Sequence, residues 1–410
     1  GGGGGGSSGG GGGSSSGTGR RQRGGGGGPP AAGRLDNARG SHPDNPLLRE
    51  FLATKNRDWT MRDIEGNVVE FCEDQNGSRF IQQRLECGNE VEQRIVMSEV
   101  LPVVRQLRNN VFGNYVVQKL LEFGTPQMKV ELRETMRGEM LDLSLQIYGC
   151  RVVQKAMETL DEADLPDLLS EFRHHVLDCI RDQNGNHVIQ KWIEVMSNKA
   201  KRASRGGNDA RAEFLGSQID FIIDDVLSHV LDLSCHTYGC RVLQRILEHC
   251  VESKKAQALD EISRCHQKLL DDQFGNYVIQ HVLQYGRHND RESVMHIVIR
   301  QGILRMSQQK FASNVVEKLL KYGTSSQRNA LVREMLRTAD AASAIPGTGD
   351  GASVVLLMVR DQYANYVVQT TLDVVPEGEE KALLREELIS HLPQLRNYTF
   401  AKHIVAKLSS

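Results

Sequence analysis

The sequence lacks any apolar stretch that is long enough to cross a membrane. Its longest uninterrupted apolar run extends only from Val354 to Val359, whereas a transmembrane helix needs roughly 18 or more such residues. It also lacks an initiator methionine and an apolar leader at Gly1, which suggests a fragment that is not secretory. We therefore expect neither a membrane protein nor a membrane partner.

Cysteines are few, and no two of them form a Cys-x-x-Cys motif. The chain has 8 cysteines in 410 residues, which is ordinary usage and excludes a disulfide-stapled miniprotein. A zinc site built from Cys235-His236 with His249-Cys250 or Cys265-His266 lacks the usual ligand spacing. We therefore expect no metal site and no cofactor. Because the remaining polar residues form no catalytic constellation either, we expect that the chain is not an enzyme.

The chain has no excess of positive charge outside its N-terminal segment. Residues 1–40 contain 20 of the 40 glycines, five of the 50 basic residues and one of the 52 acidic residues. We expect this Gly/Ser/Arg-rich segment to be a disordered tail. The other 370 residues have 45 bases and 51 acids, a net charge of −6. Such a protein does not hold nucleic acid by bulk positive charge alone.

A six-residue motif recurs along the rest of the chain. Its second residue, which we call the marker residue i, is separated from the next marker by 36, 36, 36, 54, 36, 37 and 52 residues. A period of this length is typical of stacked repeat proteins. The eight motifs are GSRFIQ (77–82), GNYVVQ (113–118), GCRVVQ (149–154), GNHVIQ (185–190), GCRVLQ (239–244), GNYVIQ (275–280), ASNVVE (312–317) and ANYVVQ (364–369).

Each motif begins an amphipathic helix. In the second unit, Val116, Val117, Leu120 and Leu121 form an apolar stripe with helical spacing, and the equivalent i+2 and i+3 residues, including Phe80, are expected in the core. A second apolar stretch precedes each motif, which suggests helix pairs. We therefore predict an all-α, right-handed superhelical solenoid over residues 41–410, crescent-shaped, with eight repeats of about 36 residues and capping half-repeats. The longer steps predict loop insertions at about 197–214 and 338–353.

Three positions in each unit share one side of the helix, because residues i and i+4 lie one turn apart with i+1 beside them. We call i and i+4 the edge positions and i+1 the stacking position. The edge positions are Ser78 with Gln82, Asn114 with Gln118, Cys150 with Gln154, Asn186 with Gln190, Cys240 with Gln244, Asn276 with Gln280, Ser313 with Glu317, and Asn365 with Gln369. The stacking positions are Arg79, Tyr115, Arg151, His187, Arg241, Tyr277, Asn314 and Tyr366.

These 24 residues are not those of an ordinary solvated helix surface. Every residue at a stacking position has a planar side chain, and seven of the eight are aromatic or guanidinium groups, which stack on flat rings. Lysine is absent from all 24 positions. The edge positions hold short or amide side chains that form hydrogen bonds of fixed geometry. The pattern favours unstacked nucleobases, one per repeat.

Glu317 is the only acidic residue among the 24. An ionised carboxylate only accepts hydrogen bonds, so Glu317 requires a base edge with two adjacent donors. Guanine N1–H and N2–H₂ form such an edge. Asparagine with glutamine, and serine or cysteine with glutamine, should define two further classes, in which the longer asparagine would meet the smaller pyrimidine.

These residues resemble the Pumilio (PUF) family of RNA-binding proteins over about residues 47–409, in all eight repeats. The resemblance implies that Asn with Gln reads uracil, Ser or Cys with Gln reads adenine and Ser with Glu reads guanine, with the RNA antiparallel to the chain. The implied target is single-stranded 5′-UGUAUAUA-3′. A ninth match, Tyr398 to Ala406, has Ala406 in place of Gln and is expected to be a cap.

The resemblance also implies a monomeric, cytoplasmic regulator that binds mRNA 3′ untranslated regions. It would repress translation and promote mRNA decay through protein co-repressors such as a deadenylase complex. One alternative is a nucleolar PUF-like protein of ribosomal RNA processing, which should have degraded edge positions and more basic charge. Another is a protein-binding solenoid scaffold, which has no need for planar stacking positions or for the change from Gln to Glu.

The negative net charge constrains how RNA is held. We expect Arg79, Arg151 and Arg241 to keep the concave face positive while acidic residues crowd the outer face. Stacking and edge contacts then supply much of the affinity, so binding should weaken less steeply with salt than for a basic, groove-tracking protein.

Overall fold

The computed structural model describes residues 45–54, 57–87, 89–339 and 352–409, which all belong to one compact unit, Ser41–Ser410. The regular secondary structure of these residues is helical, and one isolated antiparallel bridge joins Thr338 to Ser353. No helix among them is long and apolar enough to span a membrane. The tail expected at 1–40 and most of the insertion expected at 338–353 lie outside the described residues.

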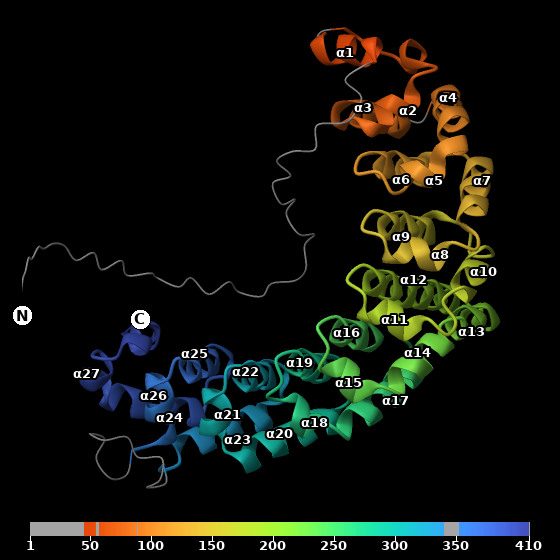
Figure 1. The fold of residues 1–410 in the computed structure, drawn as a ribbon. Coiled ribbons are helices and arrows are strands. Elements are labelled where there is room, and N and C mark those ends of the chain that lie inside the picture. The colour runs from red at the N-terminus through yellow and green to blue at the C-terminus, as the bar shows by residue number, and fades with distance from the viewer. Residues whose placement is uncertain (1–44, 55–56, 88, 340–351, 410) are drawn as a thin grey trace, which may run out of the picture. The chain divides into compact units, whose positions relative to one another are not determined.

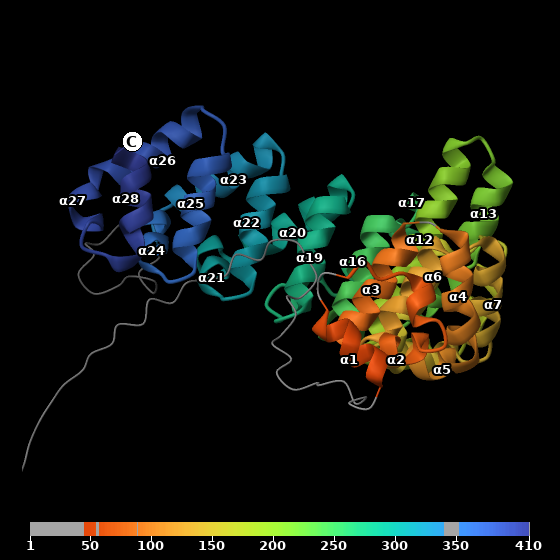
Figure 2. The same ribbon diagram turned by 90° about the horizontal axis from the view of Figure 1, so that it is seen from above.

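Eight helices carry the eight motifs and pack side by side in sequence order, as predicted. We call them the inner helices, because they line the inside of the curved row of helices in Figure 1, which Figure 2 shows from above. Each inner helix begins at the residue before its marker, except α3, which begins two residues earlier. They are α3 (Gln75–Glu86), α6 (Gly113–Phe123), α9 (Gly149–Thr159), α12 (Gly185–Arg205), α16 (Gly239–His249), α19 (Gly275–Tyr285), α22 (Ala312–Tyr322) and α25 (Ala364–Val374).

A typical repeat contains three helices, so the expected helix pair is wrong. In the third repeat, the outer helix α7 (Pro126–Met136) and the short connecting helix α8 (Met140–Leu145) precede α9. Between them Gly138 has a φ of +77°, a left-handed conformation that ends one helix and redirects the chain. Only three residues of α7 are buried, so its apolar stripe is too narrow to stand out in the sequence.

The same order recurs along the array, with caps at both ends. The outer helices are α4 (Glu90–Val100), α7, α10 (Leu165–Ser170), α14 (Asp220–Leu227), α17 (Glu252–Ser263), α20 (His288–Gln301) and α23 (Ser325–Leu336). The connecting helices are α2 (Val68–Glu73), α5 (Val104–Leu107), α8, α11 (Val176–Arg181), α15 (Val230–Ser234), α18 (His266–Leu269), α21 (Ile303–Gln308) and α24 (Val354–Arg360), with η2 (Leu101–Val103) before α5. The caps are α1 (Pro46–Ala53) and η1 (Met61–Ile64) at one end, and α26 (Glu379–Ser390), α27 (Leu392–Leu395), η4 (Thr399–Ala401) and α28 (Lys402–Ser409) at the other.

In six of the eight repeats, the turn into the inner helix is held by a side chain four residues before the marker. Asp182 Oδ1 accepts hydrogen bonds from the backbone N–H groups of Asn184 (2.8 Å) and Gly185 (2.7 Å). A Cβ on Gly185 would lie 2.7 Å from the carbonyl oxygen of Cys179, so this close approach requires glycine. Five other repeats make the equivalent contacts, through Asp74, Asn110, His236, Asp272 and Asp361.

The residues predicted as core at i+2 and i+3 are buried, with one exception. Val116, Val117 and their equivalents in the other repeats are at most 2% exposed. Phe80 of the first repeat is only half-buried, because no complete repeat precedes α3 and the short cap helix α1 packs there instead. The prediction that Phe80 lies in the core is therefore wrong, because its side chain is only partly buried. Its ring lines a cavity.

The insertion predicted as a loop at 197–214 is helical. It extends α12 to Arg205, and after a turn at Gly206 and Gly207 the chain forms α13 (Asp209–Ser217), which packs against α12. Ser197 and Ala200 are buried in this hairpin. The insertion is helical because Ala, Lys and Arg favour helix and Asn208 caps α13 by accepting a hydrogen bond from the N–H of Arg211.

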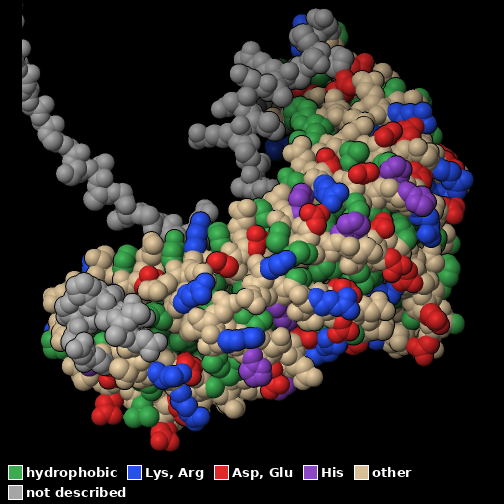
Figure 3. Space-filling view, turned by 60° about the horizontal axis from the view of Figure 1, so that its bottom comes forward, with side chains coloured by type: hydrophobic (Ala, Val, Ile, Leu, Met, Phe, Trp, Pro, Cys, Tyr) green, Lys and Arg blue, Asp and Glu red, His purple; other side chains and the backbone are tan. Residues whose placement is uncertain are grey.

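Acidic side chains do not crowd the outer face as a separate group. On the face shown in Figure 3, Lys and Arg lie among Asp and Glu. Outer helices carry ion pairs such as Arg94–Glu90, Arg137–Asp167 and Arg287–Asp260. The expectation of an acidic outer face is therefore wrong for this part of the surface, where basic and acidic residues are interspersed.

Candidate functional site

The eight marker residues lie at the starts of the inner helices and are buried. Their exposed fractions range from 0% to 4%. The structure brings each marker together with an accessible residue one turn further along the same helix. These i+4 residues are half-buried in every repeat, and they are Gln82, Gln118, Gln154, Gln190, Gln244, Gln280, Glu317 and Gln369.

In the four repeats with an asparagine marker, the asparagine is fixed by the backbone. Asn114 Nδ2 donates to the carbonyl oxygens of Asn110 (2.7 Å) and Val111 (3.0 Å), and Asn114 Oδ1 accepts a hydrogen bond from Gln118 Nε2 at 2.9 Å. The same bond between glutamine and asparagine is also 2.9 Å long in the other three repeats, from Gln190 to Asn186, from Gln280 to Asn276 and from Gln369 to Asn365.

This arrangement orients the glutamine amide. Besides the N–H that it donates to asparagine, a glutamine has a second N–H and a carbonyl oxygen. One donor beside one acceptor matches the N3–H and the neighbouring carbonyl of uracil. The same two groups also match the donor and acceptor of adenine, so the marker residue must distinguish the two bases.

In the four repeats with a serine or cysteine marker, the marker side chain also contacts a backbone carbonyl, but it has no amide oxygen to hold the i+4 residue. Ser78 Oγ and Ser313 Oγ donate to the carbonyl oxygens three residues earlier, at 3.2 and 3.3 Å. Cys150 and Cys240 make the equivalent weak contacts at 3.5 and 3.7 Å. The smaller markers therefore do not reach toward the i+4 residue as asparagine does.

In this second class, Gln154 is held differently from the glutamines of the asparagine class. Gln154 Nε2 donates to the backbone oxygen of Cys150 at 3.0 Å, whereas Gln118 donates to a side-chain oxygen. Gln82 beside Ser78 and Gln244 beside Cys240 occupy the same half-buried i+4 position as Gln154. All three glutamines thus lie at the accessible surface next to a small marker.

Both marker cysteines are protonated at neutral pH. Burial raises the pKa of the Cys150 thiol, and it raises the pKa of Cys240 to about 11. A protonated thiol is small and nearly apolar, and it is a poor nucleophile. Each cysteine is therefore a chemically inert counterpart of serine at this position.

Glu317 is positioned by the following repeat. Thr370 Oγ1 on α25 donates to Glu317 Oε2 at 3.2 Å. A carboxylate offers up to four lone-pair sites, so a carboxylate that is oriented in this way can still accept hydrogen bonds from a ligand with two donors.

The stacking positions form an accessible row beside the edge positions. Six of them are exposed and two, Asn314 and Tyr366, are half-buried. Tyr115 is 43% and Tyr277 50% exposed, so both rings are accessible to a flat ligand.

Neighbouring stacking positions act on one another electrostatically. The pKa of His187 is lowered by partial desolvation and by the positive charges of Arg241 and Arg151, which occupy the stacking positions of the repeats on either side. The imidazole is therefore neutral at physiological pH. Arg151, His187 and Arg241 lie close enough along the row for the two guanidinium charges to act on the imidazole.

A series of ion pairs runs alongside the row of edge and stacking positions. These pairs were not predicted from the sequence. A basic residue at i+5 pairs with an acid at i+8 of the preceding repeat, as in Lys119–Glu86 (2.7 Å) and Lys191–Glu158 (2.9 Å), and His281 Nε2 lies 2.8 Å from Glu248 Oε1 at the same two positions. Lys155–Glu122 and Lys407–Asp373 have the same spacing. We call these the cross-repeat ion pairs. The repeated basic and acidic residues at i+5 and i+8 are the sequence signal that could have revealed them.

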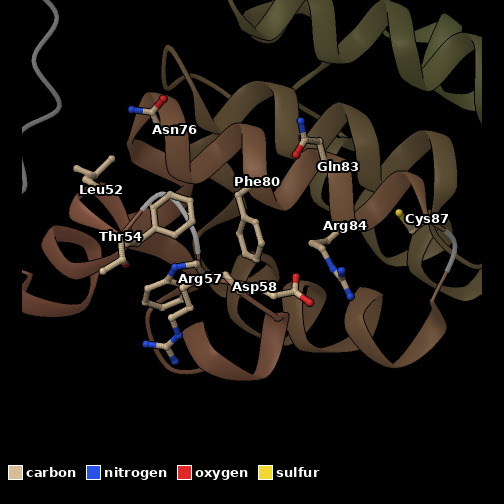
Figure 4. A pocket seen from close by; sticks show the side chains of 11 residues that line it. Leu52, Thr54, Arg57, Asp58, Asn76, Phe80, Gln83, Arg84 and Cys87 are labelled. Atoms are coloured by element: carbon tan, nitrogen blue, oxygen red, sulfur yellow. The ribbon is translucent and has the colours of Figure 1, made fainter.

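A cavity of about 670 Å³ lies at the N-terminal end of the row. In Figure 4, Phe80 points from α3 toward the segment that carries Arg57 and Asp58, while Asn76 and Gln83 lie on the same helix. The Arg57 guanidinium lies 4.0 Å from the Trp59 ring centroid. The cavity borders the first repeat but is lined by none of the 24 residues.

Within the described ranges, no group of three or more His, Cys, Asp or Glu residues is arranged to hold a metal ion. Of the residues considered for zinc, Cys250 and His266 are 1% exposed, and Ser197 Oγ donates to Cys250 Sγ at 3.6 Å. Among the residues that the structure describes, the row of edge and stacking positions is therefore the candidate site.

Comparison with known proteins identifies the repeats. A model of the Pumilio-family RNA binding repeat matches eight segments, residues 67–101, 110–132, 139–172, 175–203, 229–263, 272–299, 302–336 and 355–389. Pumilio homolog 1 of Xenopus laevis is 42% identical over 362 residues, which cover 88% of this chain and 28% of that protein. The mRNA-binding protein puf3 of Schizosaccharomyces pombe is 39% identical over 360 residues, which cover 88% of this chain and 45% of that protein. The chain thus spans less than half the length of these relatives.

Solved structures have the same fold. The Puf3 RNA binding domain bound to the Cox17 RNA 3′ UTR recognition sequence site A superposes with a TM-score of 0.76 at 35% identity, over 89% of this chain and all of that one. PUF-8 in complex with PBE-RNA gives a TM-score of 0.72 at 33% identity, over 88% of this chain and 99% of that one.

Proposed function

Because the chain belongs to the Pumilio family of sequence-specific RNA-binding repeat proteins, we propose that it binds single-stranded RNA of the sequence 5′-UGUAUAUA-3′, one base per repeat. Repeats 1 to 8 would hold A, U, A, U, A, U, G and U, so the 5′ end of the RNA lies at repeat 8. The edge positions contact the base edges, and the stacking positions lie between successive bases.

The observation that carries this proposal is the division of the edge pairs by geometry. The four repeats with asparagine share one hydrogen-bond arrangement, with the asparagine oxygen at the glutamine amide. In the repeats with serine or cysteine, the smaller marker side chain contacts a backbone carbonyl and has no amide oxygen to hold the i+4 residue. A purine reaches further toward the helix than a pyrimidine does, so the smaller marker suits adenine and the larger asparagine suits uracil.

Repeat 7 adds an independent argument. Its marker Ser313 is small, as in the repeats assigned to adenine, but its partner is Glu317 in place of glutamine. The change from amide to carboxylate removes the donor and leaves two acceptor oxygens. Guanine is the purine that presents two adjacent donors, N1–H and N2–H₂, which agrees with G at the second position of the target.

We further propose that the RNA is the 3′ untranslated region of mRNAs in the cytoplasm. The support comes from relatives: one is described as an mRNA-binding protein, and another was solved with a 3′ UTR recognition sequence. Binding there would repress translation and promote decay through co-repressors such as a deadenylase complex, with the chain acting as a monomer.

A binding titration tests the proposal. Fluorescently labelled UGUAUAUA and ACAAUAUA differ at the first three positions, which face repeats 6 to 8. We expect the first RNA to bind with a Kd lower by at least about 10²-fold, since each mismatch costs roughly 1–3 kcal/mol in base readout. Equal affinity for the two RNAs would contradict the proposed target, whereas affinity for neither would favour a protein-binding scaffold.

A further inference from the structure

The C-terminal cap contains a ninth helix of the inner row. Helix α28 packs against the last inner helix, α25, just as each inner helix packs against the next. Its sequence aligns with the motif when Lys402 is taken as the marker residue. In this register Ala401 occupies i−1, where Ala312 and Ala364 stand in the last two repeats, and all three are 0% exposed.

A cross-repeat ion pair fixes the same register independently. Lys407 Nζ contacts a carboxylate oxygen of Asp373, and these residues are i+5 of α28 and i+8 of the eighth repeat. Lys119 and Glu86 occupy the same two positions at the first junction, 2.7 Å apart. The core agrees as well, because Ile404 at i+2 is 0% exposed. The cap is therefore joined to the array in the way that one repeat is joined to the next.

The cap differs from the repeats at the edge positions. Lys402 at i is exposed, whereas all eight marker residues are buried. Ala406 at i+4 is also exposed, and it carries no polar group that a base edge could bind. At the stacking position, however, the cap has His403, which is planar and exposed as Tyr115 and Tyr277 are.

We propose that His403 is a ninth stacking residue, which covers the outer face of the 5′-terminal pyrimidine base held by Asn365 and Gln369. This inference rests on the proposed function above. Eight bases in a row have both faces covered only if nine planar groups alternate with them. The residues from Arg79 to Tyr366 supply eight such groups, and His403 supplies the ninth.

The chemistry of the position suits this role. An imidazole stacks on a base face, and stacking tolerates any base because each has a π-face. His403 therefore adds affinity without adding sequence preference, and the identity of the 5′ base is left to Asn365 and Gln369. The ion pair of Lys407 with Asp373 joins α28 to α25 at the same positions, i+5 and i+8, that join neighbouring inner helices.

The test compares two variants with two RNAs. His403→Ala removes the ring, and His403→Phe retains a ring without charge or hydrogen-bonding groups. The RNAs are UGUAUAUA and the heptamer GUAUAUA, which lacks the 5′ nucleotide. We expect His403→Ala to bind the octamer about 5- to 100-fold more weakly than the native chain and to bind the heptamer equally well. His403→Phe should bind both RNAs as the native chain does.

Other outcomes would overturn the inference. If His403→Ala binds the octamer as tightly as the native chain, no stacking contact exists. If it weakens the octamer and heptamer equally, or if His403→Phe is as weak as His403→Ala, the imidazole acts through its charge or through the fold. A thermal unfolding midpoint within about 2 °C of the native chain confirms that the variant is folded. The native chain's preference for UGUAUAUA over ACAAUAUA is measured in the same series, so failure of the proposed function is recognised separately.

Discussion

Gln118 Nε2 donates a hydrogen bond of 2.9 Å to Asn114 Oδ1, and the asparagine is itself held by two backbone carbonyls. The two amides therefore form one preorganised unit, in which the buried residue sets the orientation of the accessible one. Such preorganisation lowers the conformational entropy lost on binding. It also implies that the two edge positions contribute differently to stability and to base preference.

Substitutions at Asn276 and Gln280 should separate these contributions. Asn276→Ala removes hydrogen bonds to Asp272 and Gln273 from a fully buried site, so we expect a loss of about 1–2 kcal/mol in the free energy of unfolding. Gln280→Ala, at a half-buried site, should cost less than about 0.5 kcal/mol. Both should weaken the preference for uracil at the third base. Urea unfolding and RNA titration measure the two effects, and equal stability losses would contradict this division.

Repeat 7 should be convertible from guanine to uracil. Ser313→Asn with Glu317→Gln recreates the pair of the asparagine class, and the discrimination should change by roughly 1–3 kcal/mol. Titrations with UGUAUAUA and UUUAUAUA measure the preference. As a matched control, Asn365→Ser with Gln369→Glu should create a preference for guanine at the first base instead. A double variant of repeat 7 that still prefers guanine would mean that the assignment of repeats to bases is wrong.

Loss of a stacking side chain should lower affinity without changing base preference. Tyr277→Ala removes a ring that is 50% exposed, and we expect a cost of about 1–3 kcal/mol in RNA binding. Tyr285 provides the control, because it lies on the same helix, is 37% exposed and stacks on His281 outside the row. Tyr285→Ala should leave RNA affinity within about twofold, as a surface substitution away from the site does. A change in base preference in Tyr277→Ala would indicate that this residue contacts a base edge.

The stability of the domain should fall with pH below about 6.5, in part through His266. This residue is 1% exposed, and burial lowers its pKa although Asp290 opposes the shift. Below the ordinary histidine pKa of about 6.5, the unfolded chain binds a proton that the folded chain does not, so the free energy of unfolding decreases. The slope for one such group is at most about 1.4 kcal/mol per pH unit.

His266→Gln identifies this contribution. Glutamine keeps a polar side chain near Ser293, whose hydroxyl lies 3.4 Å from His266 Nδ1, but it does not titrate. Urea unfolding from pH 7.5 to 5.5 should give a smaller decrease in stability for the variant than for the native chain. Parallel pH profiles would show that His266 does not contribute.

The repeats and the edge and stacking positions could be predicted from the sequence because they are periodic. Seven of the eight units bury both the i+2 and i+3 residues, such as Val116 and Val117, against their neighbours, so the spacing of the inner helices follows directly from the motif. The three positions beside them then fall on one side of the row by helix geometry alone.

Other features depend on contacts that no local pattern contains. Helix α7 buries only Met128, Leu132 and Met136, and the left-handed turn at Gly138 that separates it from α8 is visible only in the backbone. The partial exposure of Phe80 depends on the size of the cap. The hydrogen bonds that distinguish asparagine from serine at the marker position likewise depend on where the preceding turn places its carbonyl groups.

The helical hairpin of α12 and α13 has a consequence for how such an array can change during evolution. Fifty-four residues separate the markers Asn186 and Cys240, yet α12 and α16 are direct neighbours in the row. The added residues extend away from the junction, so the packing of the two inner helices is kept, and under the proposed function consecutive bases would keep their spacing. An array of this kind can therefore acquire new surface between two repeats while the register of its target stays the same.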